Sequence, residues 1–117
     1  MERSKIAKLI NDYMDALRDG DYSLVRFSPN VRFLGPLMNS PIEGKSKVVE
    51  FLADVSKGVK DIRVRQHIIE GETVCVLIEF ETVKGTVLPI LDYIQIGEDG
   101  ISYIQPFFDP RPLIEEE

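Results

Sequence analysis

The chain has 117 residues, of which 44% are hydrophobic and 29% are charged. This usage is typical of a single globular domain with its own core, and the length leaves no room for a second domain. The net charge of -6, from 20 acidic and 14 basic residues, disfavours nucleic acid and anionic membranes as partners, because both repel a negative protein.

No apolar run is long enough to cross a membrane. The N-terminal residues form a charged helical pattern without a signal-peptide core, so we expect a cytoplasmic protein. The single cysteine, Cys75, and the single histidine, His67, exclude an intramolecular disulfide and the familiar Cys/His zinc sites. We therefore expect no metal and no cofactor, although a site built from carboxylates alone stays open.

The first expected element is an amphipathic helix at residues 4–18. Its apolar residues recur at three- and four-residue steps, which is the spacing of one buried helix face. Gly20 can end this helix in a left-handed conformation. Asp21 can cap a short second helix at residues 21–27, which the Pro29-Asn30 pair ends.

A short strand at residues 31–34 follows, and then an irregular connection rich in Gly, Pro, Asn and Ser. Apolar residues on one side of residues 45–57 predict a third helix, which Gly58 ends. The rest of the chain alternates between apolar and polar residues, which predicts antiparallel strands at residues 61–70, 73–84, 87–96 and 101–108.

This order of elements predicts an α+β fold in which a curved antiparallel sheet wraps around three N-terminal helices. We expect the domain to cover residues 1–112. Residues 113–117 form an acidic C-terminal tail, and its last three glutamates are expected to be a solvated, frayed end.

Side chains two positions apart share a face of a strand, so the faces of the sheet can be assigned by parity. Even-numbered strand positions from Ile62 to Ile96 form a nearly continuous apolar face and are expected to line the inside of the fold. The other face carries charges that can pair across strands, and we expect it to hold Arg63, Arg65, His67, Cys75, Leu77, Glu79, Glu81, Leu91 and Tyr93. Only a bulge would turn His67 inward.

Four strings at matching places in this order carry a family resemblance. They are YMDALRDGD at residues 13–21, VRFLGP at 31–36, IEGK at 42–45, and the ending that runs from DGI at 99–101 to FFDP at 107–110. Together they resemble the nuclear transport factor 2-like superfamily, in its ketosteroid isomerase and SnoaL-like polyketide cyclase branch. The resemblance implies a cystatin-like cone around an apolar pocket, and a homodimer formed through the outer face of the sheet.

Asp92 lies between Ile90 and Ile94 on the parity that faces inward. Burial disfavours an ionised carboxylate, and a protonated acid can donate a hydrogen bond to a carbonyl or enolate oxygen. The resemblance implies that Asp92 and Tyr13 take the places of the isomerase's two oxyanion-hole donors. Gly35, however, occupies the place of the isomerase's catalytic base, and a glycine has no side chain that could accept a proton.

The ending of the chain, at residues 104–109, also resembles limonene epoxide hydrolase. Pro106 stands where that enzyme has a catalytic aspartate, so its epoxide-opening relay is not present, and Asp109 is expected to form a turn. Met38 and Phe80 belong to the core or to the pocket, which the sequence does not separate. The residues that we expect to line the pocket are Met14, Phe33, Phe51, Val76, Ile78, Ile90, Ile94 and Phe107.

Three functional hypotheses remain open. The first is a domain that binds a small, largely apolar molecule, with Asp92 and Tyr13 as polar anchors. The second is an isomerase- or cyclase-type enzyme that uses Asp92 for acid–base or oxyanion chemistry without a cofactor. The third is a dimeric protein-interaction module in which the pocket is incidental. We favour the first, because it requires no catalytic base.

Overall fold

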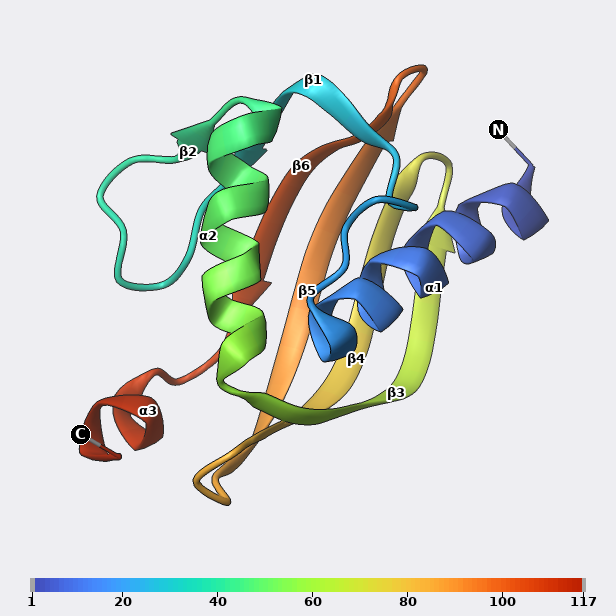
Figure 1. The fold of residues 1–117 in the computed structure, drawn as a ribbon. Helices are drawn as coiled ribbons and strands as arrows, with labels where there is room; N and C mark the ends of the chain where they lie inside the picture. Colours follow the sequence, from blue (N-terminus) through green and yellow to red (C-terminus); the bar gives the residue numbers. More distant parts are fainter. Residues whose placement is uncertain (1, 117) are drawn as a thin grey trace.

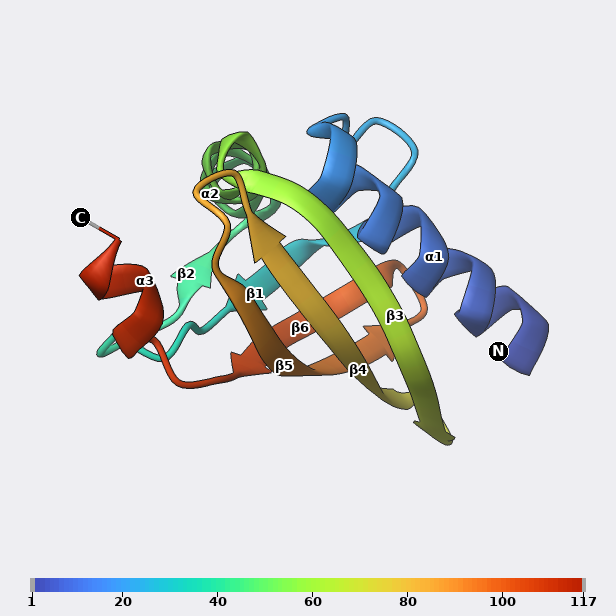
Figure 2. The same ribbon diagram turned by 90° about the horizontal axis from the view of Figure 1, so that it is seen from below.

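The structure is a computed structural model, and it describes residues 2–116. Its helices are α1 (Arg3–Asp19), α2 (Lys45–Lys57) and α3 (Arg111–Glu115); its strands are β1 (Phe27–Phe33), β2 (Ile42–Glu43), β3 (Val59–Glu70), β4 (Thr73–Thr82), β5 (Val87–Gly97) and β6 (Gly100–Phe107). The strands form one sheet in the order β2-β1-β6-β5-β4-β3. The sheet curves around α1 and α2, which lie on its concave side (Figures 1 and 2). None of the helices in the described chain is long and apolar enough to cross a membrane.

The expected α+β class is confirmed, but the arrangement of the helices is not. Residues 21–26 form a turn and β1 starts at Phe27, so the helix expected at residues 21–27 is wrong. The Asp21 carboxylate accepts the backbone N–H of Ser23 at 3.0 Å, and such a local bond competes with helix formation. The third helix within the described residues is α3, which follows the sheet.

The sheet is mixed, whereas a wholly antiparallel sheet was expected. Strands β3 to β6 form the expected antiparallel meander, but β1 pairs with β6 in parallel and with β2 in antiparallel. Pro29 lies inside β1, where the register with β6 shifts between Phe27 and Arg32. A proline is tolerated at such an irregularity because it lacks the N–H that a regular ladder needs.

Two groups of polar contacts hold the helices in place, one between α1 and the sheet and one between the turn after α1 and α2. The Arg18 guanidinium at the end of α1 donates to the Ile62 carbonyl of β3 at 2.9 and 2.6 Å. The buried Tyr22 hydroxyl shares a hydrogen bond of 2.7 Å with Ser56 and donates to the Leu52 carbonyl of α2 at 3.1 Å. The apolar face of α1 is fully or almost fully buried beneath these contacts, as its spacing predicts.

A bulge in β3 changes which of its residues face the helices. Val64 pairs with Ile78, but Gln66 pairs with Leu77, so the register shifts by one residue. Beyond the bulge His67 lies opposite the buried Val76, and Ile68 is 51% exposed. The expectation that Gln66 and Ile68 line the inside is therefore wrong. The even-numbered positions of β5 from Leu88 to Ile96 are all buried, as predicted.

Gly100 begins β6 at a point where no side chain fits. It has a φ of 120°, and a Cβ atom there would lie 2.3 Å from the Arg26 carbonyl oxygen. The same carbonyl accepts the N–H of Ile101 at 2.9 Å. The close approach of these two backbones joins the start of β6 to the segment that leads into β1.

The end of the chain is bound to the domain as far as residue 116. The Thr82 hydroxyl donates to the Glu116 carboxylate, and the Lys84 ammonium donates to the Glu116 carbonyl at 3.2 Å. Leu113 packs against the core cluster. The expectation of a solvated, frayed end is therefore wrong for Glu116, while Glu117 lies outside the described residues.

Candidate functional site

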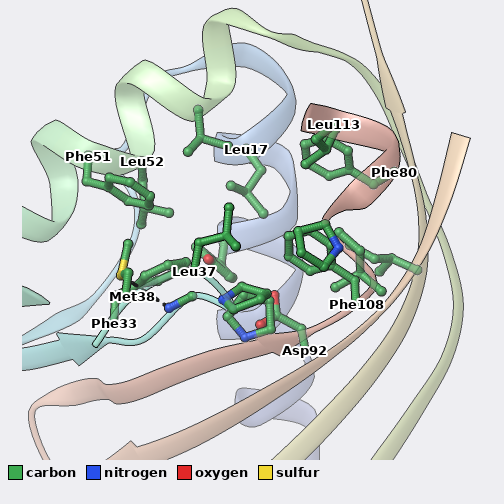
Figure 3. A pocket seen from close by; sticks show the side chains of 18 residues that line it. Leu17, Phe33, Leu37, Met38, Phe51, Leu52, Phe80, Asp92, Phe108 and Leu113 are labelled. Atoms are coloured by element: carbon green, nitrogen blue, oxygen red, sulfur yellow. Dashed lines mark hydrogen bonds between the residues drawn. The ribbon is translucent and has the colours of Figure 1, made fainter. Parts of the chain in front are cut away.

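A cavity of about 350 Å³ lies between α1, α2 and the concave face of the sheet (Figure 3). Its size is within the range of small-molecule sites. The connection between β1 and β2 borders one side, and the segment after β6 borders another. The lining residues are Tyr13, Leu17, Phe33, Gly35, Pro36, Leu37, Met38, Phe51, Leu52, Val55, Ile78, Phe80, Ile90, Asp92, Pro106, Phe108, Pro110 and Leu113.

The lining is apolar except at two side chains, Asp92 and Tyr13. It contains no lysine, arginine or histidine, so nothing in this wall can neutralise a negative charge. Within residues 2–116, no three His, Cys, Asp or Glu side chains are grouped in a way that could hold a metal ion. The chemistry available in the cavity is therefore that of one carboxyl group and one phenol.

Asp92 lies in the middle of β5, between Val76 of β4 and Pro106 of β6. Its side chain faces the cavity, as its even-numbered position predicts, and the residue is only 3% exposed. Its Oδ1 atom is shut off from solvent and has no hydrogen-bond partner within the described chain. Burial raises the pKa of Asp92 to about 7, because desolvation disfavours the ionised form. The group can therefore hold a proton near neutral pH and donate it in a hydrogen bond.

Tyr13 reaches the same cavity from the buried face of α1. Its ring packs edge-to-face against Phe27, with the ring centroids 6.2 Å apart, which fixes its direction. Burial most of all, and then the nearby charges of Asp92 and Tyr22, raise the pKa of the Tyr13 hydroxyl well above its usual value. This hydroxyl therefore keeps its proton. Asp92 and Tyr13 are thus the two side chains of the cavity wall that can donate a hydrogen bond.

The expected lining residues divide into two groups. Phe33, Phe51, Ile78 and Ile90 border the cavity, and so do Met38 and Phe80, which the sequence assigned to core or pocket. Met14, Val76 and Ile94 are instead sealed in the core and do not border it. Core and pocket residues share the same apolar chemistry and the same strand faces, so spacing alone does not separate them.

The expectation that Phe107 lines the pocket is wrong. It pairs with Leu91 on the outer side of the sheet and is 52% exposed. The cavity is instead bordered by its two neighbours, Pro106 and Phe108. Phe108 follows the last residue of β6, where the alternation of the strand ends.

Several lining residues were not anticipated, among them Leu37, Phe108, Pro110 and Leu113. Leu37 belongs to the breaker-rich connection after β1 and is 70% exposed, so two consecutive apolar residues in a loop were the available signal. Gly35 in the same connection also borders the cavity. The Gly35 N–H lies 3.2 Å from the Met38 sulfur. The position that the family resemblance assigns to a catalytic base is this glycine, which has no side chain.

The outer face of the sheet carries the predicted ion pairs. Arg63 of β3 donates to Glu79 at 3.2 Å and to Glu81 at 2.9 Å. His67 was also expected on this face, and that expectation is wrong because the β3 bulge turns the side chain inward. Its Nε2 atom is buried and has no partner among the described residues. His67 does not border the cavity.

An apolar row crosses the outer face next to these ion pairs. Leu77 of β4 lies opposite Leu91 of β5, which lies opposite Phe107 of β6. The three side chains are 37%, 38% and 52% exposed. We call them the outer apolar row.

Residues 1–117 match the family that is described as a domain of unknown function, DUF4904. The chain belongs to this family. Among curated proteins, none matches the chain significantly. Further comparison of the DUF4904 chain therefore rests on similar solved structures, which bear on its fold.

A nuclear transport factor 2-like protein of unknown function from Cytophaga hutchinsonii ATCC 33406 is 23% identical, with a TM-score of 0.77 over 93% of this chain and 94% of its own. A structure from Jannaschia sp. CCS1, described as a SnoaL-like polyketide cyclase, is 14% identical, with a TM-score of 0.79 over 97% and 94%. An uncharacterised bacterial protein with a cystatin-like fold from Silicibacter pomeroyi DSS-3 is 22% identical, with a TM-score of 0.79 over 92% and 77%. These similarities confirm that the DUF4904 chain has the nuclear transport factor 2-like fold that its sequence strings resemble.

Proposed function

We propose that this SnoaL-like domain binds a small, largely apolar molecule in the cavity, with Asp92 and Tyr13 as anchors for one polar atom. The observation that carries the proposal is the unpaired Oδ1 of Asp92 in a wall that is otherwise apolar except for Tyr13. A buried polar atom without a partner costs about 1–3 kcal/mol. Such a group is retained at this cost more readily when it has a role in binding.

The charges of the wall favour a neutral ligand with one hydrogen-bond acceptor. An anionic ligand would find no basic side chain in the lining, and an ionised Asp92 would repel it. A carbonyl oxygen, in contrast, can accept from a protonated Asp92 and from the Tyr13 hydroxyl at the same time. The ring pair Phe33 and Phe51, with centroids 5.1 Å apart, offers an aromatic wall for a flat hydrocarbon body.

An isomerase- or cyclase-type activity is the second candidate, because two donors at one acceptor can stabilise an enolate. The buried, protonated form of Asp92 supports it. The absent side chain at Gly35 disfavours it, since proton abstraction next to a carbonyl then requires a base from elsewhere, such as a bound water.

One pair of probes tests binding and catalysis together. 1-Tetralone has a carbonyl group and exchangeable protons beside it, and tetralin is the same hydrocarbon without oxygen. We expect both to bind. Asp92→Leu should lower the ratio of ketone to hydrocarbon affinity by about 2- to 12-fold, the range of one hydrogen bond, and Tyr13→Phe should lower it in the same direction. Leu24→Asn, at an exposed residue away from the cavity, serves as the control.

The binding proposal fails if neither probe binds, or if both cavity variants keep the ratio of the wild type. Deuterium incorporation into bound 1-tetralone in heavy water then separates the two candidates. Incorporation that is faster than in buffer and slower in Asp92→Leu would favour the enzyme, while the buffer rate would favour a binding domain.

We further propose that a second copy of the chain covers the outer apolar row. Leu77, Leu91 and Phe107 are contiguous and exposed, and soluble monomers rarely expose large contiguous apolar patches. A two-fold axis would place the row of one copy on the row of the other.

A further inference from the structure

The segment after the last strand forms one wall of the cavity. Pairing between β5 and β6 ends at Leu91 and Phe107, and residues 108–116, which we call the C-terminal segment, continue past the edge of the cavity. Phe108, Pro110 and Leu113 border the cavity from this segment (Figure 3). The rest of the wall belongs to α1, α2, the sheet and the connection after β1.

The C-terminal segment is attached to the rest of the described chain at its far end. Hydrogen bonds between the segment and other described residues involve Glu116 alone, and Thr82 and Lys84 are among its donors. Thr82 ends β4, and Lys84 lies in the turn between β4 and β5. Hydrogen bonds from Thr82 and Thr86, with the charge of Lys84, hold the pKa of Glu116 below its usual value.

The segment is also stiff within itself. Arg111 donates to the Asp109 carboxylate at 2.6 and 3.0 Å, and the Leu113 N–H donates to the Pro110 carbonyl at 3.0 Å. Pro110 and Pro112 restrict the backbone further. Between its ends, the segment contacts the core through the apolar side chains of Phe108 and Leu113 and is not hydrogen-bonded to it, so a stiff segment of this kind can move as a unit when the Glu116 attachment is released.

We propose that the C-terminal segment is a lid over the cavity, which opens when Glu116 leaves the turn between β4 and β5 and so controls the passage of the ligand. The inference rests on the proposed function, since it concerns access to the same cavity. Asp92 is 3% exposed, so a ligand that reaches it has to pass the side chains at the mouth. Leu37 and Leu113 of the lid line the cavity and are both reached by solvent, the first being exposed and the second half-buried.

The test measures opening without any ligand. A reporter thiol is placed in the cavity by Leu52→Cys, in a chain whose own thiol is removed by Cys75→Ser. The rate of its reaction with iodoacetamide reports how often the cavity is accessible. Glu116→Ala removes the attachment, and Glu115→Ala is the matched control, with the same change of charge at an exposed neighbouring position.

We expect Glu116→Ala to raise the labelling rate at least about tenfold, the low end of the effect of losing a hydrogen bond to a charged group, and Glu115→Ala to leave it unchanged. In the chain that keeps Cys75, which lies on the outer face, Glu116→Ala should not change the labelling rate of that thiol. Equal rates for Glu116→Ala and Glu115→Ala would overturn the lid, and so would equal acceleration at Cys75, which would indicate general loosening. Ile90→Cys is the second reporter, should Leu52→Cys fail to fold.

The lid and the proposed function fail in different ways. If 1-tetralone binds and labelling is unaffected by Glu116→Ala, the cavity is a binding site without a lid. If labelling is accelerated and neither tetralone nor tetralin binds, the segment gates a cavity whose ligand class was assigned wrongly. If both results are positive, Glu116→Ala should also speed the release of 1-tetralone relative to Glu115→Ala.

Discussion

Burial and, after it, the charge of Asp92 raise the pKa of the Tyr13 hydroxyl well above its usual value. The two side chains come from the first helix and the fifth strand, yet they border one cavity and sense each other electrostatically. An ionised Asp92 and an ionised Tyr13 would repel each other in a region of low dielectric. The pair is therefore most stable with both protons in place, which is the form that donates two hydrogen bonds.

The first prediction concerns the stability of the fold as a function of pH. The pKa of Asp92 rises from 3.8 to about 7 on folding, so the folded state binds a proton that the unfolded chain releases. Its contribution to stability is complete below about pH 4 and is lost as the pH rises through 7. Asp92→Asn removes this charge, so the variant should gain stability relative to the wild type between these values, by at most about 1.4 kcal/mol per pH unit.

Urea unfolding at pH 4.5, 6 and 7.5 measures this difference. Glu50→Gln, an exposed position on α2, provides a control that should follow the wild type. A constant difference between Asp92→Asn and the wild type across this range would show that Asp92 is ionised in the folded state throughout.

The second prediction separates the cavity wall from the core by two identical substitutions on β5. Ile94 is sealed in the core, whereas Ile90 borders the cavity. Ile94→Ala should cost about 2–5 kcal/mol because it leaves a new void. Ile90→Ala should cost at least about 1 kcal/mol less, since it enlarges a space that already exists.

For the affinity of 1-tetralone, we expect the larger effect from the substitution at Ile90. Ile90→Ala should weaken it, and Ile94→Ala should leave it unchanged under conditions in which the protein stays folded. An equal effect of the two substitutions on both measurements would mean that the cavity does not reach Ile90.

The third prediction tests the bulge in β3. Ile68 points to the outside and Ile69 packs against the core. Ile68→Asp should change the free energy of unfolding by less than about 0.5 kcal/mol. Ile69→Asp should lower it by at least about 2 kcal/mol, because a charge would replace a core contact. If Ile68→Asp lowered the free energy of unfolding more than Ile69→Asp, β3 would alternate without a bulge, as the sequence suggested.

The fourth prediction concerns the proposed dimer. Leu91→Glu places a charge in the middle of the outer apolar row and should convert dimers into monomers in sedimentation velocity experiments. Leu24→Glu, at a residue 81% exposed in the turn before β1, should sediment like the wild type. If Leu91→Glu associates as strongly as the wild type, a second copy does not cover this row.

The sequence predicted the elements whose apolar spacing is regular and missed the irregular ones. Helix α2 was predicted at residues 45–57 and is Lys45–Lys57, because its apolar face is continuous and glycine follows it. The bulge after Val64 was missed, since neither glycine nor a break in composition marks it. The parallel pairing of β1 with β6 depends on contacts between distant segments, which alternation within one strand does not encode.

The candidate site was predicted in the same uneven way. The inward direction of Asp92 follows from two apolar neighbours of equal parity, and this signal was sufficient. Its raised pKa also follows, because burial is the cause. Leu37, Phe108 and Leu113 were not predicted, because they reach the cavity from segments without helix or strand periodicity.

Gly100 has a consequence for the evolution of this shape. Any side chain at position 100 would collide with the carbonyl of Arg26, 2.3 Å from its Cβ atom, and would push the entrance of β1 away from the start of β6. The parallel ladder between these strands carries Phe33 on one side of the cavity and leads to Phe108 on the other. Homologous chains that acquire a larger residue there should have lost the hollow, or should have rebuilt this corner by an insertion in the hairpin between β5 and β6.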